Sequence, residues 1–487
     1  MGGLGLHRKT IGLITGLIAF FYFLLFWDAP TKHISYMSAI AALMAIWWTT
    51  EALPLAITAL LPLVLYPLFG ILSTKQIAPT YMSSILFLFI GGFLIALAME
   101  KWNLHKRIAL YIIRIFNGSP TQIILGFMIA TAFLSMWISN TATTVMMVPI
   151  GLAIILKLEE TFNKKITYTF SVALMLSIAY SASIGGIATL VGTPPNMTFI
   201  RLYEISFPNN PEISFGQWMK IGIPVMLTML GICWFLLTKI IFKSNSELIL
   251  NKEVVENEYQ KLSHVSYEEK VVMGVFTLTA CLWIFRKNLQ LGSIEIPGWS
   301  SLLPYPNHID DGTVAIFMAI FLFILPAKTN ETRLLDHTVF KRIPWDIILL
   351  FGGGFALAKG FQISGLSQFI GNKFSALEGV SLFLIIVLIA FGITFLTELT
   401  SNMSTTEMIL PILASIATVI QVDPLYLMIP ATLSASCAFM LPVATAPNAI
   451  VFGSERVHMK EMIKAGIWLN LIGICVISIL CAFILPL

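Results

Sequence analysis

The stretch Ser-Asn-Thr-Ala-Thr-Thr at residues 139–144, with Pro149 five positions later, returns as Ser-Asn-Met-Ser-Thr-Thr at residues 401–406, with Pro411 at the same spacing. The two copies are separated by 262 positions. Each lies inside an apolar run, where a cluster of hydroxyl and amide side chains is unusual. The pair therefore predicts an internal repeat with a polar element at the same place in each copy.

The repeat extends on both sides of these clusters. Gly-Gly-Phe at 91–93 and at 353–355 share the separation of 262, and Thr-Pro-Pro-Asn at 193–196 matches Thr-Ala-Pro-Asn at 445–448 at a separation of 252. A constant offset over such a length indicates two copies of one structural unit.

The composition places the chain in a membrane. Of its 487 residues 57% are hydrophobic and 11% are charged, whereas a soluble protein has about 25% charged residues. The five cysteines lie in or beside apolar runs without metal-ligand spacing, and we interpret them as packing residues. The first apolar run has no small-residue cleavage site, so we expect a retained first span.

The sequence predicts an all-α polytopic membrane protein with about 11 transmembrane helices. The predicted spans are 11–29, 35–50, 53–70, 81–99, 168–200, 219–242, 267–286, 311–327, 344–360, 425–451 and 466–486.

Two further apolar stretches, 120–157 and 380–421, are too long for one helix, and the polar clusters interrupt them near the middle. We interpret both as re-entrant helical hairpins, because broken backbone is tolerated at membrane depth only where protein or a watery cavity surrounds it. The segments 101–117 and 455–465 mix basic and apolar residues, which is typical of helices lying along the membrane surface. Simple connecting loops are the alternative for these two segments.

With the N-terminus in the cytoplasm and both hairpins re-entrant, most of the 29 Lys and Arg residues fall on the inner side. This topology puts the C-terminus outside and predicts a multi-pass protein of the cell inner membrane. It also makes the two copies an inverted repeat, in which substrate and ions bind between the copies near the midplane.

The topology divides the chain into five predicted regions. They are scaffold helices at 1–80, a first transport region at 81–243 with the hairpin and the broken helix 168–200, a polar cytoplasmic linker at 244–270, second scaffold helices at 271–343, and a second repeat region at 344–487 with the other hairpin, the broken helix 425–451 and the last helix.

The broken helices predict an ion and anion site. A break leaves free N–H groups at one helix end, which favour anions, and free carbonyl groups at the other, which favour cations. Neutral Ser, Thr and Asn oxygens suit Na⁺ and also donate to carboxylates. Neither polar cluster contains Lys or Arg, so a dianion needs co-bound cations: two Na⁺ ions would balance it, and a third would make transport electrogenic.

The paired motifs resemble those of the divalent anion/sodium symporter family. The stretches WWTTEALPLAITALLP at 47–62 and DPLYLMIPATLSASCAFMLPVATAPNAIVF at 423–452 strengthen the resemblance, which covers almost the whole chain. The resemblance implies a homodimer in the lipid bilayer, with a fixed scaffold and a mobile transport domain that works as an elevator. It also implies Na⁺ symport of C4-dicarboxylates such as succinate, malate and fumarate.

The resemblance also implies site residues, which transfer position by position. The first sodium site is expected at Ser135, Ser139, Asn140 and Gly192, and the second at Thr397, Ser401, Asn402 and Ala444. The substrate carboxylates are expected at Asn140, Thr141, Asn402, Ser404, Thr193 and Thr445.

One position departs from the family pattern. Family members often have Thr where this chain has Met403, and Met cannot donate a hydrogen bond. Ser404 or backbone N–H groups would have to compensate, so the preferred anion stays open.

Several alternatives remain at this point. The same fold suits sodium-independent exchange of dicarboxylates or 2-oxoglutarate, and citrate or sulfate could be the main substrate. Glu398 could help to hold Na⁺ or could brace the second hairpin, and Asn196 and Asn448 could simply satisfy backbone freed by the adjacent prolines. We see no nucleotide loop, zinc motif, paired catalytic carboxylates or Ser/His/Asp arrangement, so we expect neither an enzyme nor a nucleic-acid partner.

Overall fold

The computed structural model describes residues 2–116, 118–162, 164–243, 253–291, 294–329 and 333–484. Of the predicted linker 244–270, residues 244–252 lie outside this described part. The rest contains helix α13 (Glu253–Gln260), a connection at 261–266 and the start of α14 (Tyr267–Ile284).

The described chain is built almost entirely of helices, as predicted. In the first half these are α1 (Gly2–Leu25), α2 (Lys32–Thr50), α3 (Leu55–Ala59), α4 (Leu61–Leu68), α5 (Thr74–Ile77), α6 (Ser84–Lys101), α7 (Leu104–Ile115), α8 (Pro120–Ser135), α9 (Asn140–Thr161), α10 (Lys164–Gly186), α11 (Pro194–Ser206) and α12 (Phe215–Phe235). In the second half they are α15 (Asp311–Ile324), α16 (Trp345–Ser364), α17 (Leu366–Lys373), α18 (Leu382–Thr397), α19 (Asn402–Val419), α20 (Leu425–Ala435), α21 (Ala446–Gly453) and α22 (Met459–Ile484).

Seven helices in the described residues are long and apolar enough to cross a membrane, and five shorter apolar segments accompany them. The shorter segments include both arms that begin the hairpins, Pro120–Ser135 and Leu382–Thr397, and the first arm of the second broken helix, Leu425–Ala435. Breaks thus divide several of the predicted spans into pieces.

The two hairpins begin and end their first arms at equivalent positions. Helix α8 starts at Pro120 after a Ser119 capping box and ends at Ser135, and α18 covers Leu382–Thr397, the same range shifted by 262 positions. The return helices α9 and α19 begin at Asn140 and Asn402, again 262 apart, and each carries an internal proline. Each predicted hairpin therefore consists of two helices that meet at its polar cluster.

Both predicted broken helices are broken as well. Residues 187–193 separate α10 from α11, and residues 436–445 separate α20 from α21. The Asn196 amide donates to the carbonyl oxygens of Gly186 (3.1 Å) and Thr189 (2.7 Å). The Asn448 amide makes the equivalent bonds, 252 positions later, to Ala438 (3.1 Å) and Leu441 (3.0 Å). These asparagines satisfy the carbonyl groups that the breaks leave free.

A helix of each half also packs closely against a helix of the other half. A Cβ atom on Gly91 in α6 would lie 2.6 Å from the Ala315 backbone in α15, and one on Gly353 in α16 would lie 2.6 Å from Ala59 Cα in α3. Each glycine thus lets its helix approach a helix of the opposite half closely, which explains the repeated Gly-Gly pair.

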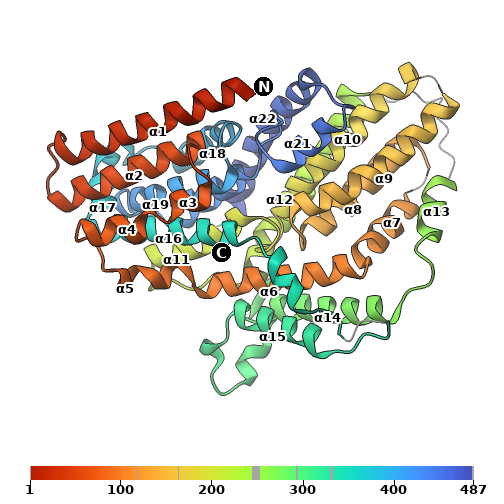
Figure 1. Cartoon of the computed structure of the whole chain (residues 1–487), viewed down its shortest axis with the longest axis horizontal. Helices are drawn as coiled ribbons and strands as arrows, with labels where there is room; N and C mark the ends of the chain where they lie inside the picture. Colours follow the sequence, from red (N-terminus) through yellow and green to blue (C-terminus); the bar gives the residue numbers. More distant parts are fainter. Residues whose placement is uncertain are drawn as a thin grey trace.

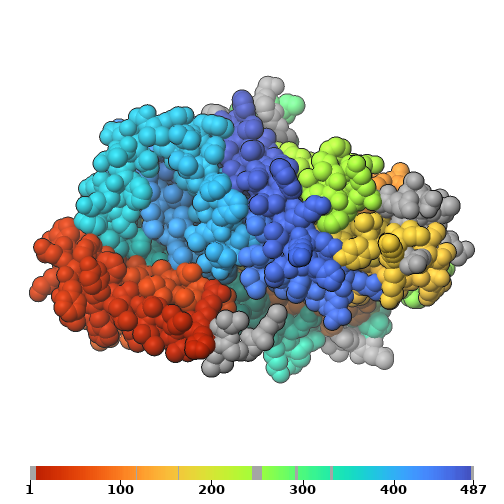
Figure 2. All heavy atoms as spheres, turned by 90° about the horizontal axis from the view of Figure 1, so that it is seen from above, coloured from red at the N-terminus to blue at the C-terminus, as the bar shows by residue number. Residues whose placement is uncertain are grey.

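Figure 1 shows α1–α5 at one end of the molecule and α7–α9 with α13 at the other. Seen from above, the blue C-terminal residues lie between the red N-terminal helices and the yellow segment near residue 150 (Figure 2). The arms that follow the breaks cross over: α11 packs on α16 and α19, and α21 packs on α9 and α10. This crossing brings the two repeats together around one central region.

The expected helix within the segment 101–117 is present as α7. Arg107 of α7 pairs with Glu269 at 2.9 Å and Arg114 pairs with Glu256 of α13 at 2.7 Å, so acidic side chains cover its basic face. Two other local features differ from the expectations. The segment 455–465 is not a separate surface element, because α22 already begins at Met459. A short hairpin of β1 (Leu289–Leu291) and β2 (Ile294–Ile296) interrupts the helical architecture.

Candidate substrate and ion site

A cavity of about 560 Å³ lies where the two hairpins and the two broken helices meet. Its wall includes Ser139–Thr141 from the first tip and Ser401–Met403 from the second. Gly192–Pro195 and Ala444–Pro447 from the breaks complete the polar part. The two polar clusters that the repeat predicts therefore line one cavity. The volume of this cavity is in the usual range for small-molecule sites.

Four helices begin at this cavity, namely α9, α11, α19 and α21. Their first N–H groups have no partner within the helix and carry partial positive charge. Ser139 Oγ accepts the Ala142 N–H at 3.3 Å and Thr445 Oγ1 accepts the Asn448 N–H at 3.3 Å, whereas neither Thr193 nor Ser401 caps its helix through its side chain. The remaining N–H groups suit an anion.

The cavity wall contains one charged side chain, the exposed carboxylate of Asp346, within the part of the chain that the structure describes. Helix ends and neutral side chains therefore supply the positive potential for an anion. Charge compensation beyond these dipoles has to come from bound cations.

The first expected sodium site is a cluster of oxygen atoms behind the first tip. The buried Ser135 hydroxyl donates to the Asn140 side-chain oxygen at 2.6 Å and lies 2.7 Å from the Ala182 carbonyl oxygen in α10. The Asn140 side-chain atom that contacts Ser135 also lies 3.2 Å from the Gly192 carbonyl oxygen. Ser135, Asn140 and Gly192 are thus brought together, and Ser139 caps the adjacent helix.

The orientation of the Asn140 amide decides what this cluster can hold. With its oxygen inward, the Asn140 side chain faces the oxygen atoms of Ser135, Ala182 and Gly192, which are ligands of the kind that Na⁺ takes. With its nitrogen inward, the amide donates to Ser135 Oγ, to Ala182 and to Gly192 instead. The donor set therefore fits Na⁺, and one rotation of the amide satisfies the same groups without it.

The second expected site repeats this arrangement. The Thr397 hydroxyl donates to the Asn402 side-chain oxygen at 2.7 Å and lies 3.0 Å from the Ala435 carbonyl oxygen in α20. Thr397 is fully buried, and Ser401, Asn402 and Ala444 line the cavity in front of it. The carbonyl oxygens of Ala182 and Ala435 were not among the predicted ligands, because a backbone carbonyl leaves no signal in the sequence.

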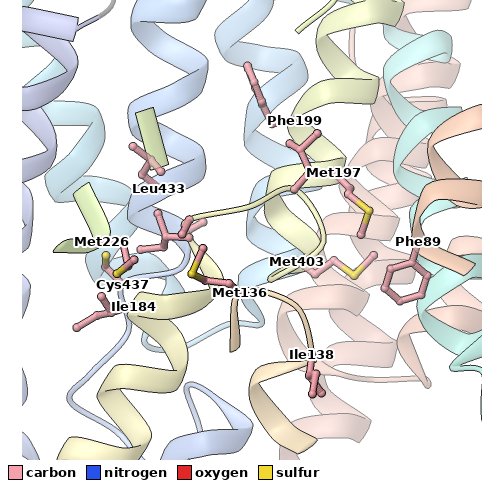
Figure 3. Packing of buried hydrophobic residues seen from close by; sticks show 14 of the residues in the cluster. Phe89, Met136, Ile138, Ile184, Met197, Phe199, Met226, Met403, Leu433 and Cys437 are labelled. Atoms are coloured by element: carbon pink, nitrogen blue, oxygen red, sulfur yellow. The ribbon is translucent and has the colours of Figure 1, made fainter. Parts of the chain in front are cut away.

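Most of the expected substrate residues line the cavity, namely Asn140, Thr141, Asn402, Thr193 and Thr445. Ser404 is not in the wall, and its side chain is fully buried. Met403 itself lines the cavity, and Figure 3 shows its side chain directed toward Phe89 of α6. Sequence reasoning did not single out Phe89, Trp137 or Asp346 as cavity residues.

Glu398 braces the second break instead of facing the cavity. Its carboxylate accepts the backbone N–H groups of Phe439 (2.7 Å), Met440 (2.8 Å) and Leu441 (3.1 Å). The Asn470 amide of α22 donates a fourth bond at 2.7 Å. With its acceptor capacity used in this way, the bracing interpretation of Glu398 is the one that the contacts support.

Residues 9–485 match the family model described as the sodium:sulfate symporter transmembrane region. The chain belongs to this family. The resemblance to divalent anion/sodium symporters is thereby confirmed, and the sodium:sulfate symporters are multi-pass membrane transporters and not enzymes.

Curated relatives within the sodium:sulfate symporter family cover nearly the whole chain. The sodium-dependent dicarboxylate transporters SdcS of Staphylococcus aureus strains MRSA252 and NCTC 8325 are each 44% identical, over 98% of this chain and 91% of their own length.

Two solved structures share the fold at low sequence identity. The YdaH transporter of Alcanivorax borkumensis aligns with a TM-score of 0.55 at 12% identity, over 98% of this chain and 96% of its own. MtrF of Neisseria gonorrhoeae, described among antimetabolite efflux pumps, aligns with a TM-score of 0.57 at 11% identity, over 98% and 93%. At this identity the likeness concerns the fold alone.

Proposed function

We propose that this chain imports C4-dicarboxylates, such as succinate, malate and fumarate, by symport with Na⁺. The observation that carries the proposal is the pair of oxygen clusters, Ser135–Asn140 and Thr397–Asn402, on either side of one cavity. Relatives named sodium-dependent dicarboxylate transporters, 44% identical over nearly the full length, support the same cargo.

The chemistry of the cavity agrees with a dianion bound together with cations. Helix-terminal dipoles contribute roughly 0.3–1 kcal/mol each at exposed positions, up to about 2 kcal/mol when partly buried. Moving a charge of −2 inward against a potential of 100 mV costs on the order of 4.6 kcal/mol. Because no Lys or Arg lines the described wall, co-transported Na⁺ supplies the missing charge and the driving force.

The side chains divide the work between cations and anion. Ser135, Ser139 and Asn140 with the Gly192 backbone hold one Na⁺, and Thr397, Ser401 and Asn402 with the Ala444 backbone hold the other. Asn140, Thr141, Thr193, Asn402 and Thr445 face the carboxylates from both repeats. Ser404 would reach a carboxylate only if the second tip shifted, because its fully buried side chain does not line the cavity here.

The wider arrangement follows from the repeat. We propose an inverted repeat in a homodimer, with hairpins and broken helices carried as an elevator past the helices of the scaffold. The protein would lie in the cell inner membrane with its N-terminus in the cytoplasm and its C-terminus outside. The cross-packing of Gly91 on Ala315 and of Gly353 on Ala59 supports equivalent roles for the two halves.

Purified protein in liposomes provides the test. Saturable uptake of labelled succinate is expected with an inward Na⁺ gradient, and uptake should fall to background in choline or potassium buffer. Equal uptake in all three buffers would contradict Na⁺ coupling, and a requirement for dicarboxylate inside the liposomes would identify an exchanger. Competition by malate, fumarate, 2-oxoglutarate, citrate and sulfate then ranks the substrates.

A further inference from the structure

Two buried glutamates lie on the second hairpin, and their surroundings are opposite. Glu398 is 3% exposed and accepts four hydrogen bonds, three from the backbone of the second break and one from the Asn470 amide. Glu407 of α19 is 0% exposed, and neither of its carboxyl oxygens has a hydrogen-bond partner among the described residues. The donors that stabilise a carboxylate are therefore present at Glu398 and missing at Glu407.

Glu407 packs against the backbone of α16. A Cβ atom on Gly354 would lie 2.5 Å from the Glu407 carboxyl carbon and 2.8 Å from one carboxyl oxygen, so the missing side chain of Gly354 makes room for the acid. Tyr81 of η1 (Ala78–Tyr81) is the ionisable group that faces Glu407, and its hydroxyl donates to the Ala59 carbonyl oxygen instead. The described protein thus encloses the carboxyl without a polar bond to it.

The described helices around α19 provide no counter-ion for Glu407. Those packed on it are α2, α11, α16, α17, α18 and α20, and none of their ionisable groups bonds to either carboxyl oxygen. Arg201 of α11 pairs with Glu204 at 3.0 Å, and Lys359 of α16 bonds to the Gln76 carbonyl oxygen at 3.0 Å. The other ionisable groups on these helices are Lys32, His33 and Tyr36 of α2, Tyr203 of α11, Asp346 of α16, Lys373 of α17 and Tyr426 of α20. A negative charge on Glu407 would therefore stay uncompensated.

The acid belongs to the second hairpin only. A shift of 262 positions converts Glu407 into Val145, which is 55% exposed, and Gly354 into Gly92. The geometry that the two tips share therefore does not include this carboxyl.

Burial without donors or a counter-ion determines the charge of Glu407. Transfer of an ionised carboxylate into such surroundings is so costly that the group binds a proton instead. A hard cation in place of the proton would need a shell of several oxygen ligands. Within the described residues no group of acidic, His or Cys side chains that could hold a metal gathers there, and the unpartnered Ser404 hydroxyl one turn earlier on α19 adds a single oxygen. The contacts therefore favour a proton over a metal ion.

We propose that Glu407 is a proton-binding site of the second hairpin. Its neutral carboxyl allows α19 to pack on α16, and the carboxyl releases its proton to water, leaving a carboxylate, when the hairpin is carried away from Gly354. The release rests on the proposed function, because it takes the hairpin to move relative to α16. The packed form holds one proton more than the hydrated form, since a hydrated glutamate is ionised at neutral pH. A rise in pH therefore favours the hydrated form, by up to about tenfold per pH unit.

Infrared spectroscopy of the purified protein at neutral pH tests the proton directly. The difference spectrum between the unmodified protein and Glu407→Gln should contain the C=O stretch of a protonated carboxyl, which a carboxylate lacks. The band should persist in saturating Na⁺. Absence of the band, or its loss on addition of Na⁺, would overturn the proposal, because the carboxyl would then be ionised or would hold a cation.

Thermal unfolding gives a second measurement that needs no transport. Glu407→Gln keeps the shape of the neutral acid and cannot ionise, so its melting temperature relative to that of the unmodified protein should rise as the pH rises from about 6 to about 9. The reason is that only the unmodified chain has to bind a proton in order to fold at these pH values. Glu407→Met, which is apolar and of similar length, should fold and show the same trend.

Glu398→Gln is the matched control for this trend. Its amide cannot accept all four hydrogen bonds of Glu398, so its melting temperature should fall, without the rise with pH that Glu407→Gln shows. An equal rise in both variants would count against a special role of Glu407. Failure of both Glu407→Gln and Glu407→Met to fold would also contradict the proposal, because a neutral side chain would then not be tolerated there.

Uptake in liposomes tests the release of the proton during transport. The rate of Na⁺-dependent succinate uptake by the unmodified protein, divided by the rate for Glu407→Gln, should fall as the pH rises from about 6 to about 9, by at most about tenfold per pH unit. The ratio removes the effect of pH on the charge of succinate, which both proteins share. A ratio independent of pH would contradict the release. Absence of Na⁺-dependent uptake by the unmodified protein would instead contradict the proposed function, and the infrared and melting results would still decide whether Glu407 binds a proton.

Discussion

The Thr397 hydroxyl donates a hydrogen bond of 2.7 Å to the side-chain oxygen of Asn402. The corresponding side-chain atoms of Ser135 and Asn140 also lie 2.6 Å apart, 262 positions earlier, and with its nitrogen turned inward the Asn140 amide donates this bond to Ser135 Oγ. In each repeat the hydroxyl ends the first arm of a hairpin and the asparagine begins the second, so the bond crosses the tip. Two independent copies of one geometry indicate that the tip, and not the single residue, is the functional unit.

Replacing Thr397 by Ala should weaken sodium binding at the second tip. The change removes one oxygen ligand and one bond that orients Asn402, which together are worth about 1.4 kcal/mol or a tenfold rise in the half-saturating Na⁺ concentration. Thr397→Ser should behave like the unmodified protein, because Ser135 performs this role in the first repeat. Sodium titration of succinate uptake measures the effect.

Thr418→Ala is a suitable control for that substitution. The Thr418 hydroxyl bonds to the Ala414 carbonyl oxygen of its own helix at 3.0 Å, far along α19 from the tip. Its removal should leave the Na⁺ dependence unchanged. A similar shift in both variants would mean that Thr397→Ala acts through general loss of helix stability.

Gly186→Ala should disturb the first ion cluster by displacing the Asn140 side chain. A Cβ atom on Gly186 would lie 2.6 Å from Asn140 Oδ1 and 3.1 Å from the Gly192 carbonyl oxygen, so Asn140 has to move. We expect at least a tenfold loss of Na⁺ affinity, and a weaker helix cannot be its cause, since Ala favours the helix more than Gly does. In Gly274→Ala the new methyl group meets open space, and this variant should transport normally.

The repeat explains how much of this arrangement could be predicted from the sequence. The polar motifs at 139–144 and 401–406 locate both tips because Ser, Thr and Asn are conspicuous in apolar runs, and the constant offset pairs them. The Pro-Asn step in each motif marks a break, since an unpaired carbonyl group in the membrane needs a donor. Both tips and both breaks therefore appear in the structure where the motifs predict them.

Other contacts could not be predicted because their signal is not in the side chains. The carbonyl oxygens of Ala182 and Ala435 approach the tips through backbone, which any residue provides. Ser404 looks like a cavity residue by its position next to Met403, but helix geometry turns adjacent residues about 100° apart and buries it. The ion pair between Arg114 of α7 and Glu256 of α13 joins residues on either side of many intervening helices. No pattern in the sequence predicts such a contact.

Removal of Arg286 should destabilise the fold outside the site. Its guanidinium is fully buried and bonds to Asp311 (2.5 Å), to Glu212 (2.5 Å) and to the Ile309 carbonyl oxygen (2.8 Å). Burial opposes ionisation of Glu212, but Arg286 and Lys287 outweigh it and lower the pKa of this carboxyl below its ordinary value.

Arg286→Met leaves the two carboxylates without their shared partner, which costs about 3–5 kcal/mol. The melting temperature of the purified protein should fall by several degrees, and Arg286→Lys should recover only part of the loss because Lys lacks the fork of donors. A melting temperature equal to that of the unmodified protein would show that the carboxylates find water or protons instead.

Position 403 decides how the second tip meets a carboxylate. Thr141 and Met403 occupy the same position of the repeat and both line the cavity, but only Thr141 can donate a hydrogen bond. Met403→Thr should therefore add one neutral hydrogen bond, worth about 0.5–1.5 kcal/mol, and lower the succinate concentration for half-maximal uptake by about 2- to 13-fold. Thr141→Met should raise it by a similar factor. Two outcomes would contradict this expectation: weaker succinate uptake by Met403→Thr, or a shift of preference from succinate to citrate or sulfate in competition. Met403 would then be acting with Phe89 as an apolar wall that fits the methylene chain of the anion. The carboxylate would in that case lie nearer the first tip.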